Sequence, residues 1–129
     1  MMNDTLANAL STIMNAEKIG RKECTIKSSS KIVEKVLETM KENQFLGEFK
    51  KTESRRGNSL KINLLNNINK CGVIKPRHSV KKDNYEKFEK RFLPAKGFGV
   101  LIVSTPEGIM TQEDAKNKEI GGKLLAFVY

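Results

Sequence analysis

The 129-residue sequence predicts an α+β protein made of two small α/β domains packed together. Apolar residues recur with a helical period in two N-terminal segments, whereas short alternating or β-branched runs typical of strands recur further along the chain. A third observation divides the chain, because Asn66, Asn67 and Asn69 form a turn-rich cluster near its middle. We therefore expect an N-terminal α/β domain over residues 1–67 and a β-rich C-terminal domain over residues 68–129.

Residues 4–18 are predicted to form the first helix, with Asp4 as a capping residue. The apolar side chains of this segment share one helical stripe: Leu6, Leu10, Ile13 and Met14. The opposite face carries uncharged hydrogen-bonding side chains: Asn8, Ser11, Thr12 and Asn15. An ordinary solvated face would carry Lys and Glu, so this face is unlike one that meets only solvent.

A short strand near residues 23–27 precedes a second helix, which is predicted to run from the serines at 28–30 to about Asn43. Five apolar residues are expected to face the core: Ile32, Val33, Val36, Leu37 and Met40. The outer face alternates Lys and Glu and is therefore of the ordinary solvated kind.

Two strands of a hairpin are predicted at residues 45–52 and 59–65, because apolar and polar residues alternate clearly in the second of them. A basic tip at residues 55–58 should join the two strands. The N-terminal domain is thus predicted to have the order helix, strand, helix, hairpin.

The C-terminal half is predicted to consist mostly of strands with one short helix. Val73 and Ile74 begin a strand that Pro76 should end, since proline cannot donate to a ladder. Residues 100–103 are wholly apolar and rich in β-branched side chains. Such a run is typical of a strand buried on both faces, so we expect it to be the central strand.

The short helix is predicted from Thr111 and Asp114, which have the spacing of a capping box. Gly121 and Gly122 should then turn the chain into a last strand over residues 124–129.

The formal charge of +9 is unevenly placed. The excess falls between residues 51 and 100, where four acidic residues oppose thirteen basic ones: Lys51, Arg55, Arg56, Lys61, Lys70, Lys75, Arg77, Lys81, Lys82, Lys87, Lys90, Arg91 and Lys96. A concentrated positive charge attracts polyanions by releasing their counterions, so nucleic acid is the first partner to consider and an anionic membrane the second. A merely solubilising surface is the alternative.

The longest apolar run has six residues, 124–129, far short of the ~20 that span a bilayer. The N-terminus lacks the pattern of a secretory or organelle signal, and we therefore expect a cytoplasmic protein. Cys24 and Cys71 are 47 positions apart. In that setting they are expected to be reduced, buried thiols.

No residue combination predicts catalysis. His78 is the single histidine and lies in a basic stretch without an evident partner. Cys24, Cys71 and His78 lack the paired spacing of zinc ligands. Residues 97–99 resemble half of a phosphate-binding loop but precede a strand, whereas such a loop follows one. We expect no enzyme activity, metal or cofactor.

Three segments remain as candidate contact sites. Residues 28–31 place hydroxyls and a cation at a helix N-terminus, which favours an anion, although one serine can simply cap the helix. Residues 104–108 leave the predicted central strand with exposed hydroxyls, or form an ordinary turn. Residues 121–123 would let a nucleic-acid backbone approach closely, or form a tight turn. Phe98 could stack on a base, but an aromatic beside an apolar strand is more often part of the core.

Two segments resemble the S-eight family of small-subunit ribosomal proteins: GVLIVSTPEGIMT at residues 99–111 and GGKLLAFVY at residues 121–129. The resemblance extends to LSTIMNA at 10–16, SSK at 29–31 and GVIKPR at 72–77, and so covers nearly the whole chain.

The resemblance implies a non-enzymatic primary binder of small-subunit ribosomal RNA, seated on a helix of the central domain, that helps to nucleate subunit assembly. Its expected partners are this RNA and neighbouring small-subunit ribosomal proteins, without a membrane, and it is expected to be a monomer outside the ribosome. The stretch 71–94 is most similar to the archaeal and eukaryotic branch.

By position, the resemblance implies that Ser104 and Thr105 approach a distorted RNA helix, with Pro106, Gly121, Gly122 and Lys123 beside them. Bacterial relatives carry a hydroxyl residue at the position of Pro106 and an acid at that of Lys123, so Lys123 is suited instead to a phosphate. In the N-terminal half it implies RNA contacts by six residues: Ser11, Thr12, Asn15, Ser29, Ser30 and Lys31. The predicted phosphate-contacting cations are Lys75, Arg77, Lys81 and Lys82.

Phosphate contacts position a protein, and contacts to base edges and irregular shape specify its site. Because a regular A-form helix hides its major groove, short hydroxyl side chains would need an irregular region of RNA. One alternative is an RNA-processing enzyme subunit, but the sequence offers no metal-ligand cluster or histidine pair to support it. The other is a general DNA-binding architectural protein, which the positive charge permits.

Overall fold

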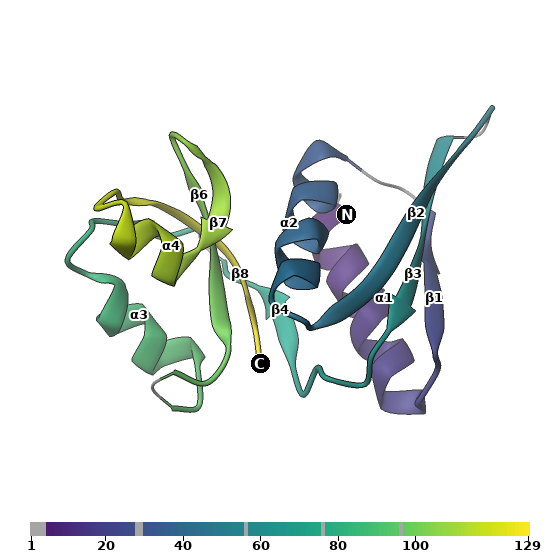
Figure 1. Ribbon diagram of the computed structural model, residues 1–129, viewed down its shortest axis with the longest axis horizontal. Coiled ribbons are helices and arrows are strands. Elements are labelled where there is room, and N and C mark those ends of the chain that lie inside the picture. The colour runs from purple at the N-terminus through teal and green to yellow at the C-terminus, as the bar shows by residue number, and fades with distance from the viewer. Residues whose placement is uncertain (1–4, 28–29, 56, 76, 96) are drawn as a thin grey trace. The chain divides into compact units, whose positions relative to one another are not determined.

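The computed structural model describes residues 5–27, 30–55, 57–75, 77–95 and 97–129. Within these ranges it contains four helices and two antiparallel sheets, which confirms the predicted α+β class (Figure 1). The chain divides into two compact units, Met1–Ile68 and Asn69–Tyr129.

The first unit has the predicted order of helix, strand, helix and hairpin. Its elements are α1 (Thr5–Ile19), β1 (Glu23–Ile26), α2 (Lys31–Glu42), β2 (Leu46–Ser54) and β3 (Gly57–Leu64). The strands form an antiparallel sheet in the order β1-β3-β2, and both helices cover one face of it (Figure 1). No helix among the described residues of this unit covers the other face.

The core of the first unit joins the apolar stripes of the helices to the inner face of the sheet. Its most deeply buried members include Leu10, Ile13, Val33, Val36, Leu37, Met40, Leu60 and Ile62. The prediction that Ile32 faces the core is wrong, since its side chain is 41% exposed. Ile32 lies about 100° around the helix from Val33, outside the stripe. The predicted cap Asp4 lies outside the described residues.

The hairpin turn is shorter than predicted. Ser54 pairs directly with Gly57, so Gly57 and Asn58 belong to β3, and the connection is the two residues 55 and 56. Two-residue loops fit the right-handed twist of paired strands best, which explains why the ladder continues this far. Arg56 lies outside the described residues.

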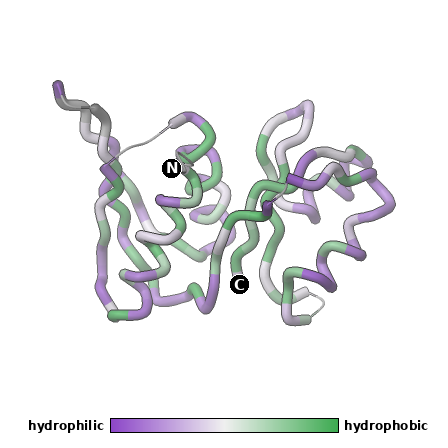
Figure 2. The backbone as a smooth tube through the Cα atoms, turned by 180° about the vertical axis from the view of Figure 1, so that it is seen from behind, coloured by the Kyte–Doolittle hydropathy of each residue, from purple (hydrophilic) through white to green (hydrophobic). Residues whose placement is uncertain are grey.

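The second unit contains two helices around a five-stranded antiparallel sheet. Its elements are β4 (Cys71–Val73), β5 (Ser79–Val80), α3 (Tyr85–Phe92), β6 (Val100–Thr105), β7 (Gly108–Thr111), α4 (Gln112–Asn117) and β8 (Gly122–Val128). The predicted central strand, β6, is internal, with three consecutive buried residues at 101–103. β8 pairs with β4, β5 and β6 and is therefore the hub of the sheet. The apolar runs of both strands are green in Figure 2.

The α3 helix was not predicted from the sequence. Tyr85 and Phe88 are buried and Phe92 is partly buried, at positions i, i+3 and i+7 of one helical face. The Tyr85 hydroxyl donates to the carbonyl oxygen of Ile120 at 2.9 Å. The α4 helix begins as predicted, because Thr111 Oγ1 accepts a hydrogen bond from the Asp114 N–H at 3.3 Å.

Cys24 and Cys71 are both buried, as predicted. Burial, and secondly the Glu17 carboxylate, raise the pKa of the Cys24 thiol to about 11, so it is uncharged at neutral pH and a poor nucleophile. In the described ranges, no helix combines the length and apolar character needed to cross a membrane.

Candidate nucleic-acid interface

Ser104 and Thr105 end β6 and lead into the turn to β7. The Ser104 side chain is exposed. Thr105 is only 8% exposed. Its Oγ1 donates to the Gly108 carbonyl oxygen at 2.7 Å and accepts from the Glu107 N–H at 3.2 Å. Of the two predicted hydroxyls, that of Ser104 is therefore placed to meet a ligand, and that of Thr105 holds the turn in shape.

Pro106 and Glu107 form the two-residue connection, since Thr105 pairs with Gly108. Pro106 is exposed, and its fixed φ suits the first central position of a turn.

Strand pairing places Lys123 between two serines. Lys123 of β8 stands opposite Ser79 of β5 on one side and Ser104 of β6 on the other. Residues directly opposite each other in antiparallel strands project from the same face, and all three side chains are exposed. We call these three residues the Ser79–Lys123–Ser104 row. It combines one positive charge with two short hydroxyl groups, the donors that suit a phosphate oxygen or a ribose hydroxyl.

Ser79 was not predicted as a site residue. β5 has only two residues, which is too short for alternation to reveal a strand, and nothing in the local sequence indicates a pairing with residue 123. Only the tertiary pairing of β5 with β8 reveals Ser79.

Gly121 and Gly122 let strands of the protein approach each other. A Cβ atom on Gly121 would overlap the carbonyl oxygen of Val80, and one on Gly122 would overlap that of Ser104 and lie 2.9 Å from Val103 Cγ1. The space left by the missing side chains is thus filled by β5 and β6. The tight-turn interpretation does not apply to Gly122, which begins β8. These glycines position the row.

The four predicted cations of this unit flank β5. Lys75 and Arg77 precede the strand, Lys81 and Lys82 follow it, and all four are exposed. Two hydrogen bonds hold this segment to β8: Ile74 N–H, just before Lys75, donates to Leu125 O, and Leu124 N–H donates to His78 O. The cations therefore lie at the edge of the sheet where the row begins.

His78 and Phe98 differ in their surroundings. The His78 ring packs on Phe88, with ring centroids 5.3 Å apart. Phe98 was expected more often to be core, but its side chain is 56% exposed, which corrects that expectation. Its backbone N–H donates to the carbonyl oxygen of Ala95 at 3.1 Å.

In the first unit, Ser11, Thr12 and Asn15 occupy the exposed face of α1 as predicted. The Thr12 hydroxyl donates to the Asn8 carbonyl oxygen at 2.9 Å. Two adjoining hollows of about 680 and 330 Å³ lie along α1 and β1, and Thr12 and Thr25 line both. We call them together the α1–β1 groove. Its further lining includes Asn8, Asn15, Ile19, Arg21, Lys22 and Lys27.

The groove brings together residues that no sequence pattern connected. Arg21 and Lys27 add positive charge at separate parts of its lining, and Thr25 adds a hydroxyl from β1. The alternation within the four-residue strand β1 gives no hint that α1 lies beside it. The groove offers hydroxyl, amide and cationic hydrogen-bond donors.

The start of α2 lies beyond Lys27 in the chain. Ser30 is the N-cap, and its Oγ accepts a hydrogen bond from the Val33 N–H at 3.4 Å. The capping interpretation is therefore confirmed for Ser30. Lys31 is exposed, whereas Ser28 and Ser29 lie outside the described residues.

The charge and donors of both surfaces favour binding of a polyanion. In the ranges that the structure describes, no group of three or more His, Cys, Asp or Glu side chains is placed to hold a metal ion. The family model described as Ribosomal protein S8 matches residues 4–129. The match includes both the row and the groove.

Proposed function

Because the chain belongs to the ribosomal protein S8 family, we propose that it is a primary binder of the central domain of small-subunit ribosomal RNA. Members of this family are non-enzymatic components of the small subunit that bind ribosomal RNA and associate with other ribosomal proteins. The alternative of an RNA-processing enzyme is therefore set aside. The protein seats on one helix of the central domain and helps to nucleate assembly of the subunit.

The Ser79–Lys123–Ser104 row is the observation that carries this proposal. Its three side chains project from one sheet face, and the pairing of three strands holds them there. Short, rigidly placed donors suit an irregular segment of RNA, where displaced bases or an altered backbone bring acceptors within reach. Lys123 meets a phosphate in this arrangement, in keeping with its charge.

Thr105, Pro106, Gly121 and Gly122 support the row. Thr105 closes the turn that carries Pro106, and the glycines allow β8 to approach β5 and β6. Lys75, Arg77, Lys81 and Lys82 supply phosphate contacts that do not depend on sequence. We propose that residues 68–129 form the main recognition domain.

The N-terminal domain, residues 1–67, adds a second contact to the same RNA. Thr12 and Asn15 reach the RNA from the α1–β1 groove, Ser11 from the exposed face of α1, and Lys31 from the start of α2. Ser29 and Ser30, which precede Lys31 in the sequence, also contact the RNA. The Ser30 Oγ accepts a hydrogen bond from the Val33 N–H as the cap of α2, and its hydroxyl proton is available to donate to the RNA. We propose that the chain belongs to the archaeal and eukaryotic branch of the family, because residues 71–94 are most similar to that branch. We also propose that it is a monomer outside the ribosome.

Hydroxyl-radical footprinting tests the proposal. The purified full-length chain is bound to transcribed small-subunit ribosomal RNA without other ribosomal proteins. We expect one compact protected region within a helix of the central domain, because a primary binder needs no prior partner. Competition with duplex DNA at physiological salt is the control for the architectural alternative. Protection spread over many helices, or equal competition by DNA, would contradict the proposal.

A further inference from the structure

We propose that the outer face of the three-stranded sheet, together with the tip of the β2–β3 hairpin, binds a second stretch of RNA phosphate backbone. This surface is formed by Thr25, Lys50, Thr52, Ser59, Lys61 and Arg55, and we call it the outer sheet face. The inference rests on the proposed function for its partner, an RNA, but involves none of the residues assigned above to the row or to α2.

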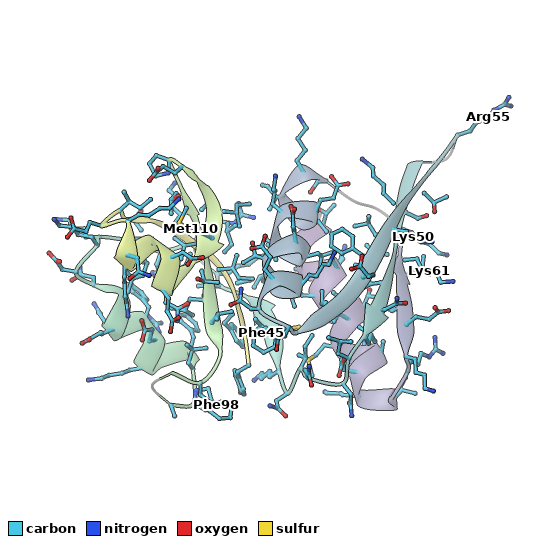
Figure 3. The ribbon with its side chains drawn as sticks, in the orientation of Figure 1. Phe45, Lys50, Arg55, Lys61, Phe98 and Met110 are labelled. Atoms are coloured by element: carbon cyan, nitrogen blue, oxygen red, sulfur yellow. The ribbon has the colours of Figure 1, made fainter. Side chains whose placement is uncertain are left out.

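Two lysines stand directly opposite each other on this face. Lys50 of β2 pairs with Lys61 of β3 (Figure 3). Thr25 of β1 pairs with Lys61 on its other side. All three side chains are exposed. Like charges directly opposite each other in a sheet repel and are destabilising. An anion bound between Lys50 and Lys61 would reduce this repulsion.

The protein itself neutralises this pair only in part. Lys61 Nζ lies 3.5 Å from a Glu23 carboxylate oxygen, but both side chains are more than half exposed, and such surface pairs contribute little. Among the described side chains, Lys50 has no ion pair. Lys51, which points to the other side of the sheet, is paired with Glu34 at 3.2 Å. Of these two adjacent lysines of β2, the one without an ion pair among the described side chains therefore lies on the outer face.

The hairpin extends this charge away from the sheet. β1 pairs only with residues 60–63 of β3, whereas β2 and β3 continue to the pair of Ser54 and Gly57. Figure 3 shows Arg55 at the far end of this extension. Arg55 lies five positions beyond Lys50 in the chain, about 17 Å away at ~3.3 Å per residue. The guanidinium fork suits a phosphate.

The polarity of the face favours RNA over a protein partner. The six residues that define it carry hydroxyl groups or positive charges, and the carboxylate of Glu23 lies beside Lys61 on the same face. Thr52 stands opposite Ser59 between the lysine pair and the tip. Protein interfaces have an apolar, often aromatic centre, whereas interfaces with nucleic acid are polar and positively charged. Thr25 also lines the α1–β1 groove, so the outer sheet face is continuous with a surface already proposed to meet RNA.

The test is the salt dependence of binding to transcribed small-subunit ribosomal RNA by full-length Lys50→Gln. We expect the slope of log affinity against log salt to fall by about 0.7–0.9, the value for one phosphate contact, and by about twice that when Arg55→Gln is added. Lys35→Gln is the matched control, because it removes the same charge from an exposed position on α2. Its slope should equal that of the parent.

Thermal unfolding at low salt separates binding from folding. Lys50→Gln should unfold at the same temperature as the parent or higher, because it removes a repulsion and keeps the Lys61–Glu23 pair. A slope unchanged from the parent would overturn the inference, even if the compact footprint and so the proposed function stand. The inference would also be overturned if Lys50→Gln bound isolated ribosomal proteins more weakly while its salt slope for RNA stayed the same. In that case the partner of the outer sheet face would be an acidic segment of a protein. If the parent gives no compact footprint, the proposed function fails instead.

Discussion

Ser104 and Thr105 are adjacent residues with similar side chains, but the fold uses them differently. Ser104 is exposed in the row, while the Thr105 hydroxyl is engaged within the β6–β7 turn. We expect Ser104→Ala to cost about 1–3 kcal/mol of binding to cognate RNA and to leave scrambled RNA unaffected, because it removes a specific contact. Parallel titrations of the two RNAs measure this.

Thr105→Val is the matched comparison for Ser104→Ala. It keeps the shape of the side chain but removes both turn hydrogen bonds, so it should lower the free energy of unfolding by about 1–3 kcal/mol. Ser104→Ala should leave that quantity nearly unchanged. Equal losses of cognate and scrambled binding in Ser104→Ala would reject a specific role for this hydroxyl.

Gly122 shows how a small residue can position a site without touching a ligand. In Gly122→Ala the new Cβ would overlap the Ser104 backbone carbonyl, which cannot rotate away as a side chain can. We expect a loss of at least about 1–3 kcal/mol of unfolding free energy, as for other overpacked sites, together with weaker cognate RNA binding. Chemical denaturation and RNA titration measure the two effects.

Gly72→Ala is a control for the Gly122 substitution. Its Cβ would meet only the ring of Phe127, at 3.3 Å, and a ring can shift by a few tenths of an ångström. A loss as large in Gly72→Ala as in Gly122→Ala would argue against backbone overlap as the cause.

Glu17 is an acidic side chain in a nearly buried position, 8% exposed. Burial raises the pKa of its carboxyl above 4.5, although the backbone N–H groups of Asn66 and Ile68 partly oppose the shift. Because the pKa of Glu17 is higher in the folded than in the unfolded state, its protonation stabilises the fold, and this stabilisation is complete at pH values below the unfolded-state pKa. This stabilisation is lost as the pH rises through the folded-state pKa.

We therefore expect Glu17→Gln, which cannot ionise and keeps an acceptor oxygen, to gain stability relative to the parent as the pH rises from about 4 to 7. Denaturation curves of both proteins at several pH values measure the difference. A difference that does not change with pH would show that Glu17 titrates alike in the folded and unfolded states.

At the scale of elements, α3 shows why a helix in a basic segment can be missing from a prediction based on sequence patterns. Its three aromatic positions are separated by Lys, Glu and Arg, and its N-cap Asn84 makes no side-chain capping bond. The helix is stabilised by tertiary contacts, chiefly the buried Tyr85 and its hydrogen bond to Ile120. That bond also ties α3 to the segment just before Gly121.

We expect Tyr85→Phe to lower the free energy of unfolding by about 0.5–1.5 kcal/mol, because it removes one hydrogen bond. Tyr85→Ala should cost about 3–5 kcal/mol, because it also leaves a cavity. Denaturant titrations of the two variants measure the losses. Similar losses in both variants would mean that the hydroxyl, not the packing of the ring, dominates.

At the scale of the whole molecule, the uneven charge predicts how binding responds to salt. Lys81 and Lys82 are exposed beside the row, and replacing both with Gln should weaken binding to cognate and scrambled RNA alike. The slope of log affinity against log salt should fall by about 0.7–0.9 for each phosphate that the variant no longer neutralises. Titrations over a series of salt concentrations measure it, and an unchanged slope would count against phosphate binding by this pair.

Local signals were enough to predict much of this architecture. The stripes of α1 and α2, the alternation in β3 and the cap at Thr111 depend on residues within a few positions of each other, so their periodicity is visible in the chain. The basic segment and the STPEG turn were found for the same reason. Such features express local propensity and patterning, which do not require knowledge of distant partners.

Other features depended on which distant segments meet. Opposition of Lys123 to Ser79 and Ser104, and of Lys50 to Lys61, arises from the register of strands that are separated in the chain. A shift of one residue would turn each side chain to the other face, and no local pattern specifies that choice for a strand as short as β5. The folded arrangement therefore decided that Ser104 is exposed, that Thr105 serves the turn, and that the glycines hold strands together.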